Sequence, residues 1–165
     1  MTCIAAKINR HRVTFAWESA VTQGECLIID STPKVIPIGS WGPVGGSGAA
    51  ATIATGFNVF GSTSNLERLV ERIHTTFRGK VSEDESSDWL FFHQGSLVTV
   101  ENGGACIKPS SPFWAIGGGS WLALGAMEAG ASARRAVEIS CKYHNGCYPP
   151  VHTLVWDTKK EVVVK

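Results

Sequence analysis

The order of strand-like and helix-like segments constrains the fold of this 165-residue chain more than any single motif. Apolar alternation predicts strands, and three- to four-residue spacing predicts helices. The expected strands are 2–8, 13–18, 34–38, 89–93, 96–100, 106–109, 113–116, 151–157 and 161–164, and the expected helices are 49–60, 64–77, 121–129 and 132–143. Strands thus alternate with pairs of helices. The order predicts an α+β fold in which two sheets each carry a helix pair on the outer face, a four-layer αββα sandwich in one domain spanning residues 1–165.

Local signals mark several boundaries of these segments. Turns are expected at 9–12, at Gly24-Glu25 and at Gln94-Gly95. Ser64 and Glu67 have the spacing of a capping box at a helix start. Gly130 suits the end of one helix and Ser132 the start of the next. The polar, acidic stretch 78–88 predicts a solvated loop rather than a domain linker.

The composition excludes several classes of function. Fifteen basic and fourteen acidic side chains leave a net charge of +1, and no basic tract is present, which argues against nucleic-acid binding. No apolar run is long enough for a membrane span, and the first twenty residues lack the apolar region of a signal peptide. Five cysteines without a CxxC pair favour a reducing compartment. We therefore expect a cytoplasmic protein that contacts neither membrane nor nucleic acid.

The chain opens MTCIAAKI, which places Thr2 at the very start of the first expected strand. If Met1 were removed, Thr2 would carry a hydroxyl and a free α-amine on one residue. These two groups together supply a nucleophile and its base. The same threonine also fits the simpler interpretation of an ordinary strand residue.

Several segments, taken together, resemble one known family. They are MTCIAAKI, the strand end Trp17-Glu18-Ser19, Lys34-Val35, the GGSG turn, AIGGGSWLALGA and the tail GASARRAVEISCKYHNGCYPPVHTLV. In order and spacing they are similar to the proteasome β-subunit family, above all to bacterial HslV and its short phage- and prophage-encoded relatives. The resemblance covers nearly the whole chain. It implies the αββα fold of the N-terminal-nucleophile (Ntn) hydrolases and threonine peptidase activity without a cofactor.

The resemblance also implies roles for individual residues. Thr2 matches the nucleophile, Lys34 the lysine that lowers its proton affinity, and Glu18 stands where the family has an aspartate that holds this lysine. Gly45 or Gly46 would offer the backbone N–H for the oxyanion. As an alternative without chemistry, Glu18 and Lys34 would form a surface ion pair, and the glycine clusters would be plain turns.

Three features depart from the family pattern. Glu18 is one methylene longer than aspartate. Gly118 falls where the family has a serine that orders the amine and a water, and Ser120 is the nearest hydroxyl that could replace it. The sequence is given with Met1, and a retained Met1 would bind the Thr2 amine in a peptide bond and remove the base. These departures predict weak or absent activity.

A second cluster of chemically active residues lies near the end of the sequence. Two thiols and two imidazoles occur within twelve residues, at Cys141, His144, Cys147 and His152. Such a set can bind zinc, although this spacing is not a strong zinc motif. The alternative is a helix end followed by a proline-braced turn, and we expect no metal.

Two classes of function remain open from the sequence. The first is a threonine peptidase subunit in a homo-oligomeric ring that works with an ATP-dependent unfoldase on peptide substrates. The second is a proteasome-fold protein without catalysis, a structural or assembly component, plausibly of a phage particle and then located in the virion. Whether the chain is an enzyme therefore depends on whether Thr2 has a free amine.

Overall fold

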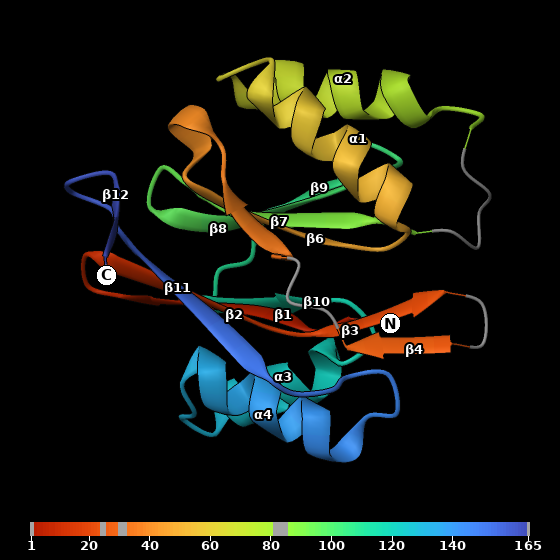
Figure 1. Ribbon diagram of the computed structural model, residues 1–165. Coiled ribbons are helices and arrows are strands. Elements are labelled where there is room, and N and C mark those ends of the chain that lie inside the picture. Colours follow the sequence, from red (N-terminus) through yellow and green to blue (C-terminus); the bar gives the residue numbers. More distant parts are fainter. Residues whose placement is uncertain (1, 24–25, 30–32, 81–85, 165) are drawn as a thin grey trace.

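The chain folds into four layers, with two antiparallel sheets stacked face to face between two pairs of helices (Figure 1). The structure is a computed structural model that describes residues 2–23, 26–29, 33–80 and 86–164. The layer order confirms the αββα architecture that the sequence predicts. None of the helices in these ranges is long and apolar enough to cross a membrane.

The first sheet contains both ends of the described chain. Its strand order is β10 (Phe113–Ile116), β1 (Ile4–Asn9), β2 (Arg12–Glu18), β11 (Val151–Asp157) and β12 (Val162–Val164). On the outer face lie α3 (Ser120–Glu128) and α4 (Ala133–Tyr143). β2 pairs with β1 on one side and with β11 on the other, so it joins the first strand of the chain to one of the last.

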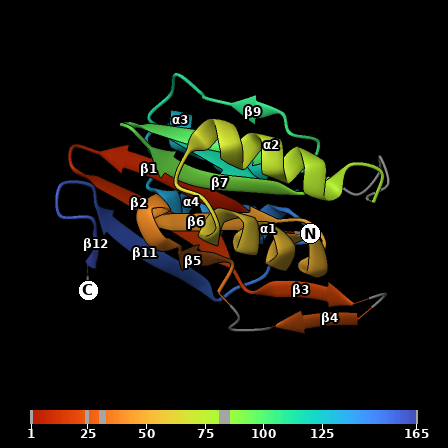
Figure 2. The same cartoon turned by 90° about the horizontal axis from the view of Figure 1, so that it is seen from above.

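The second sheet is built from the middle of the chain. Its order is β5 (Val35–Pro37), β6 (Pro43–Ser47), β7 (Asp88–His93), β8 (Ser96–Glu101) and β9 (Cys106–Ile107). A short 3-10 helix, η1 (Gly39–Trp41), joins β5 to β6, and the outer face carries α1 (Ala50–Gly61) and α2 (Leu66–Phe77). A separate hairpin of β3 (Ala20–Gln23) and β4 (Cys26–Ile29) projects from the edge of the molecule (Figure 2).

Three apolar cores separate the four layers. Because side chains of a strand alternate between faces, β1 directs Cys3 and Ala5 toward α3 and α4, and Ile4 and Ala6 toward the second sheet. The central core between the sheets also holds Phe15, Leu90 and Leu97. The core beneath α1 and α2 is aromatic, with Trp41, Phe60, Phe77, Trp89 and Phe91. The third core, beneath α3 and α4, consists mainly of small residues, which let α4 pack closely on β1 and β2.

Most of the expected boundaries lie within two residues of those observed. The turn at Gln94-Gly95 has both residues at positive φ, and Ser132 caps α4 by accepting a hydrogen bond from the Arg135 N–H at 3.2 Å. Gly130 follows the end of α3 at φ +96°. The turn expected at Gly24-Glu25 lies outside the described residues.

Two local predictions are wrong. The capping box at Ser64 does not form, because Asn65 caps α2 with its side-chain oxygen, 3.0 Å from the Arg68 N–H. The segment expected as a solvated loop ends before residue 88, since Ser87 is buried and Asp88 begins β7. Residues 81–85 of that segment lie outside the described ranges.

Candidate active site

Thr2, Glu18 and Lys34 come together at one end of the two sheets. Thr2 lies two residues before the start of β1, Glu18 ends the neighbouring strand β2, and Lys34 directly precedes β5 in the other sheet. The Lys34 Nζ lies 3.3 Å from the Thr2 Oγ1 and also donates to the Glu18 Oε1 and to the Ala20 carbonyl oxygen. Three residues far apart in sequence thus form one continuous hydrogen-bonded group.

The Glu18 carboxylate is completely buried but fully supplied with donors. Its Oε1 accepts from the Cys3 N–H at 3.3 Å, and its Oε2 accepts from the N–H groups of Ala20 at 2.5 Å and Tyr148 at 3.3 Å. A buried charge without such partners would cost several kcal/mol. The extra methylene of glutamate therefore does not prevent contact with Lys34, because the surrounding backbone accommodates the longer side chain.

The Lys34 side chain is nearly buried, with 11% of its surface exposed. Its ammonium group is held by a carboxylate and a carbonyl and has one remaining direction, toward the Thr2 hydroxyl. A fixed cation beside a hydroxyl oxygen favours the deprotonated form of that hydroxyl when it acts as a nucleophile. The arrangement can therefore stabilise an alkoxide at Thr2.

The loop between β10 and α3 fixes the backbone of Thr2. The Gly119 N–H donates to the Thr2 carbonyl oxygen at 3.2 Å. Gly117 has φ +89°, and a Cβ at this position would lie 2.3 Å from the same oxygen. Only glycine fits there. The adjacent Gly118 and Ser120 line the same cleft as Thr2 and Lys34.

The two glycines expected to serve the oxyanion occupy different environments. Gly46 lines the cleft, but its N–H donates to the Lys34 carbonyl oxygen at 3.0 Å and is therefore already in use. Gly45 faces the core between the sheets, where a Cβ would lie 3.0 Å from Ile4 Cγ2. Because the Gly46 N–H is already bonded and Gly45 does not line the cleft, neither glycine offers the oxyanion donor expected from the sequence.

The cleft itself is large, about 1020 Å³, and runs between the ends of the two sheets. Thr2, Lys34 and the first turn of α1 form one part of its wall, and the ends of β7 and β8 form another. Four polar residues of this wall were not predicted from the sequence: Ser47, Asp88, Thr99 and Glu101. Ser47 belongs to the GGSG turn, but no motif marks Asp88, Thr99 and Glu101, because they meet only through the register of β7 and β8.

The four possible zinc ligands do not converge. Cys147 Sγ lies 3.6 Å from His144 Nδ1, but His152 lies on β11, where its Nε2 pairs with the Ser19 Oγ at 2.7 Å. Within the described ranges, no group of three or more His, Cys, Asp or Glu side chains is arranged to hold a metal ion. The structure therefore gives no support to the zinc alternative.

Cys3 follows the candidate nucleophile but points away from the cleft, into the core beneath α3 and α4. Its thiol contacts the Ser140 Oγ at 3.5 Å. The neighbouring Cys147 thiol and burial together raise the pKa of Cys3 well above its usual range. Cys3 therefore stays a neutral thiol and does not compete with Thr2 as a nucleophile.

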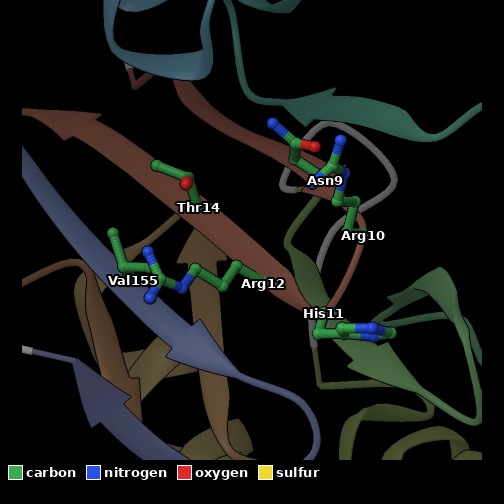
Figure 3. Close-up of a pocket in the computed structure, with 6 residues that line it drawn as sticks. All are labelled: Asn9, Arg10, His11, Arg12, Thr14 and Val155. Atoms are coloured by element: carbon green, nitrogen blue, oxygen red, sulfur yellow. The ribbon is translucent and has the colours of Figure 1, made fainter.

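A second hollow, about 580 Å³, lies at the β1–β2 turn, at the opposite end of β1 from Thr2. Asn9, Arg10, His11 and Arg12 line it together with Thr14 and Val155. Figure 3 shows the side chains of Arg10, His11 and Arg12 leaving the turn in three different directions. They do not converge as an anion site would require, so the cleft at Thr2 is the better candidate site.

The four-layer αββα fold is similar to that of solved proteasome-like structures. No family model and no curated protein matches the sequence. Among solved structures, BPH from Thiobacillus denitrificans in complex with epoxomicin is 21% identical with a TM-score of 0.76, over 94% of this chain and 98% of that one. HslV from Trypanosoma brucei is 19% identical with a TM-score of 0.78, over 94% and 99%. At these identities the likeness establishes the fold alone.

Proposed function

We propose that this chain, once trimmed to Thr2, is a proteasome- or HslV-like subunit that hydrolyses peptide bonds with low efficiency. The observation that carries the proposal is the 3.3 Å contact between the Lys34 Nζ and the Thr2 Oγ1. This contact is maintained by a buried carboxylate with donors from three separate parts of the chain. A surface ion pair would not need such support.

The proposed reaction uses only groups of this chain and water. The free Thr2 amine takes the proton of its own hydroxyl, directly or through a water, while Oγ1 bonds to the substrate carbonyl carbon. The Lys34 cation lowers the energy of the charge on Oγ1. Collapse of the tetrahedral intermediate breaks the C–N bond, and the leaving amine takes the proton from the Thr2 ammonium. Water then cleaves the acyl ester by the same steps and restores Thr2.

Two features account for the expected low efficiency. The Gly46 N–H is engaged with Lys34, so the oxyanion would need other donors. Gly48 and Ala49 line the cleft at the start of α1, and the first N–H groups of a helix have no partner within it. Gly118 supplies no hydroxyl to order the amine, and losing one preorganised donor costs about a hundredfold or more in rate.

The assembly we propose follows from the same resemblance. The chain would form a homo-oligomer and, if active, receive unfolded chains from an ATP-dependent unfoldase. Trp121 at the start of α3 is 82% exposed, and most of Ala49–Ala54 is exposed as well. Tryptophan is enriched in protein–protein interfaces, so the exposure of Trp121 supports a contact surface on α3.

Intact-mass spectrometry followed by peptide hydrolysis tests the proposal. Protein that begins at Thr2 should cleave unstructured peptides slowly, and Thr2→Ala or Lys34→Ala should abolish this cleavage. Thr75→Ala, on the exposed face of α2, is the matched control and should retain it. Epoxomicin, the compound in the Thiobacillus complex, is a suitable probe, and its binding should also require Thr2. Equal cleavage by wild type and Thr2→Ala would place the activity elsewhere.

The second candidate is a catalytically silent structural or assembly protein of the same fold, with a phage particle as one setting. The glycine at position 118 favours it, because a protein without catalytic duty has no need of the missing hydroxyl. Met1 lies outside the described residues, so the mass of the natural protein together with the hydrolysis assay distinguishes the two candidates. A retained Met1 and no hydrolysis would favour the structural role.

A further inference from the structure

Two carboxylates face each other across β7 and β8 on the wall of the cleft. Asp88 pairs with Glu101, and the next inward-facing pair is Leu90 with Thr99. Trp89 and Val100 point toward α1 and α2, whereas Leu90 belongs to the core between the sheets. By alternation, Asp88, Thr99 and Glu101 therefore point to the side on which Thr2 lies, and all three line its cleft.

This placement is electrostatically unfavourable for the chain alone. Like charges directly opposite each other on neighbouring strands repel. Burial and the Glu101 carboxylate raise the pKa of Asp88 to about 6. Across the described residues, the only ion pairs are Lys34 with Glu18, and Arg134 and Arg135 with Glu138, so neither cleft carboxylate has a basic partner there. A cation brought by a ligand would relieve this repulsion.

A third side chain at the same place also lacks a partner. Thr99 is 3% exposed, and its Oγ1 has no hydrogen-bond partner in the described part of the chain. Buried hydroxyl groups are nearly always hydrogen-bonded. Because Thr99 lies two residues from Glu101 and diagonally from Asp88, its hydroxyl and both carboxylates offer unused hydrogen-bonding capacity to one part of the cleft.

We propose that Asp88, Thr99 and Glu101 form a subsite for a cationic side chain, lysine or arginine, of a peptide that lies across the cleft. This subsite rests on the proposed function, since it selects substrates for Thr2. β6 lies between this subsite and Lys34. On one side of β6 the Gly46 N–H donates to the Lys34 carbonyl oxygen, and on the other side Ser47 pairs with Asp88 of β7. Two strand spacings are about 10 Å, the length of about three extended residues. The recognised side chain therefore lies two or three residues from the bond that is cut.

The test compares two peptide series on protein trimmed to Thr2. The peptides differ only in carrying lysine or its uncharged analogue norleucine at each position within three residues of the cut. Wild type should prefer lysine at one position by about tenfold or more in kcat/KM, since a hydrogen bond to a charged group is worth about 1.5–3 kcal/mol. In the double variant Asp88→Asn/Glu101→Gln, the ratio of kcat/KM for the lysine peptide to that for the norleucine peptide should fall to about one. Thr99→Val should lower it by a smaller factor.

Controls separate this subsite from the activity on which it rests. Glu128→Gln removes one carboxylate charge at the exposed end of α3 and should leave the ratio unchanged. If no peptide is cut, the proposed function fails, and binding of the same peptides to Thr2→Ala decides the subsite alone. Tighter binding of the lysine peptide, lost in Asp88→Asn/Glu101→Gln, would still support it. Equal ratios or equal binding in wild type and this variant would overturn it.

Discussion

At the scale of single residues, Glu18 is central because its carboxylate holds Lys34 and accepts three backbone N–H groups. Replacing it with glutamine keeps the size but removes the charge that balances Lys34. Removing one partner of a buried ion pair typically lowers the free energy of unfolding by about 3–5 kcal/mol. We therefore expect Glu18→Gln to lower the free energy of unfolding by several kcal/mol in urea denaturation.

The natural control for this substitution is Glu138→Gln on α4. Glu138 pairs with Arg134 and Arg135 at 3.1 and 3.2 Å, but these side chains are largely exposed. Exposed pairs contribute at most about 1 kcal/mol. If both substitutions changed the unfolding free energy equally, Glu18 would not be the buried anchor that the geometry indicates.

Asp88 yields a prediction about pH. Because its pKa in the folded chain is about 6 rather than 3.8, the folded state holds the proton more tightly than the unfolded chain does. Stability therefore falls as pH rises from about 4 to about 6 and remains lower above that range. Asp88→Asn removes the ionised form and should stabilise the protein at pH 7 by about 1–3 kcal/mol.

The same reasoning predicts how the gain in unfolding free energy from Asp88→Asn depends on pH. It should shrink on acidification and disappear below about pH 4, where Asp88 is protonated in both states. Thermal unfolding of wild type and variant between pH 4 and 7 measures it. A gain that stays constant over this range would show that the titration of Asp88 is not its source.

At the scale of elements, the packing of α1 depends on a glycine in its middle. A Cβ at Gly56 would lie 2.1 Å from the indole of Trp89, which fills the core beneath α1 and α2. Gly56→Ala should therefore destabilise the fold by about 1–3 kcal/mol despite the better helix propensity of alanine. Gly125→Ala in α3 meets no atom within 4 Å and should stabilise slightly. Chemical denaturation of both variants would reveal opposite signs, and equal signs would contradict this packing.

The elements also show what sequence patterns can and cannot predict. The strands and helices of the two large sheets and their covers were predictable because they have a regular apolar period and recognisable boundaries, as at Gln94-Gly95 and Ser132. The β3–β4 hairpin was not among the expected strands. The cap of α2 was not predictable, because Ser64 and Asn65 are both good caps and only the geometry selects one. Glu18 and Lys34 were selected through the resemblance, whereas Thr2 was first singled out by its position behind Met1. The Asp88–Glu101 pair had no signal, since register between strands decides it.

At the scale of the whole molecule, the outer surface carries apolar groups that a monomer does not need. Trp121 is 82% exposed on α3, and we expect it to be covered by a neighbouring copy. If the wild type assembles as proposed, Trp121→Arg should shift it toward monomer in light scattering at micromolar concentrations, because tryptophan is frequent among the residues that dominate interfaces. Glu71→Arg, on the exposed face of α2, is the control. A monomeric wild type would refute the assembly.

The position of Tyr148 in the sequence determines when, during synthesis of the chain, the site can form. Its N–H is one of the donors to Glu18, and β11, which follows directly, pairs with β2 along its whole length. Tyr148 follows Glu18 by 130 residues, so Thr2 and Glu18 are made long before the surroundings of the site can be complete. A nascent chain stalled before Tyr148 should therefore bind no threonine-directed probe, whereas the released chain should. If the proposed peptidase activity is present, the site therefore forms too late to cut unfolded polypeptides nearby while the chain itself is being made.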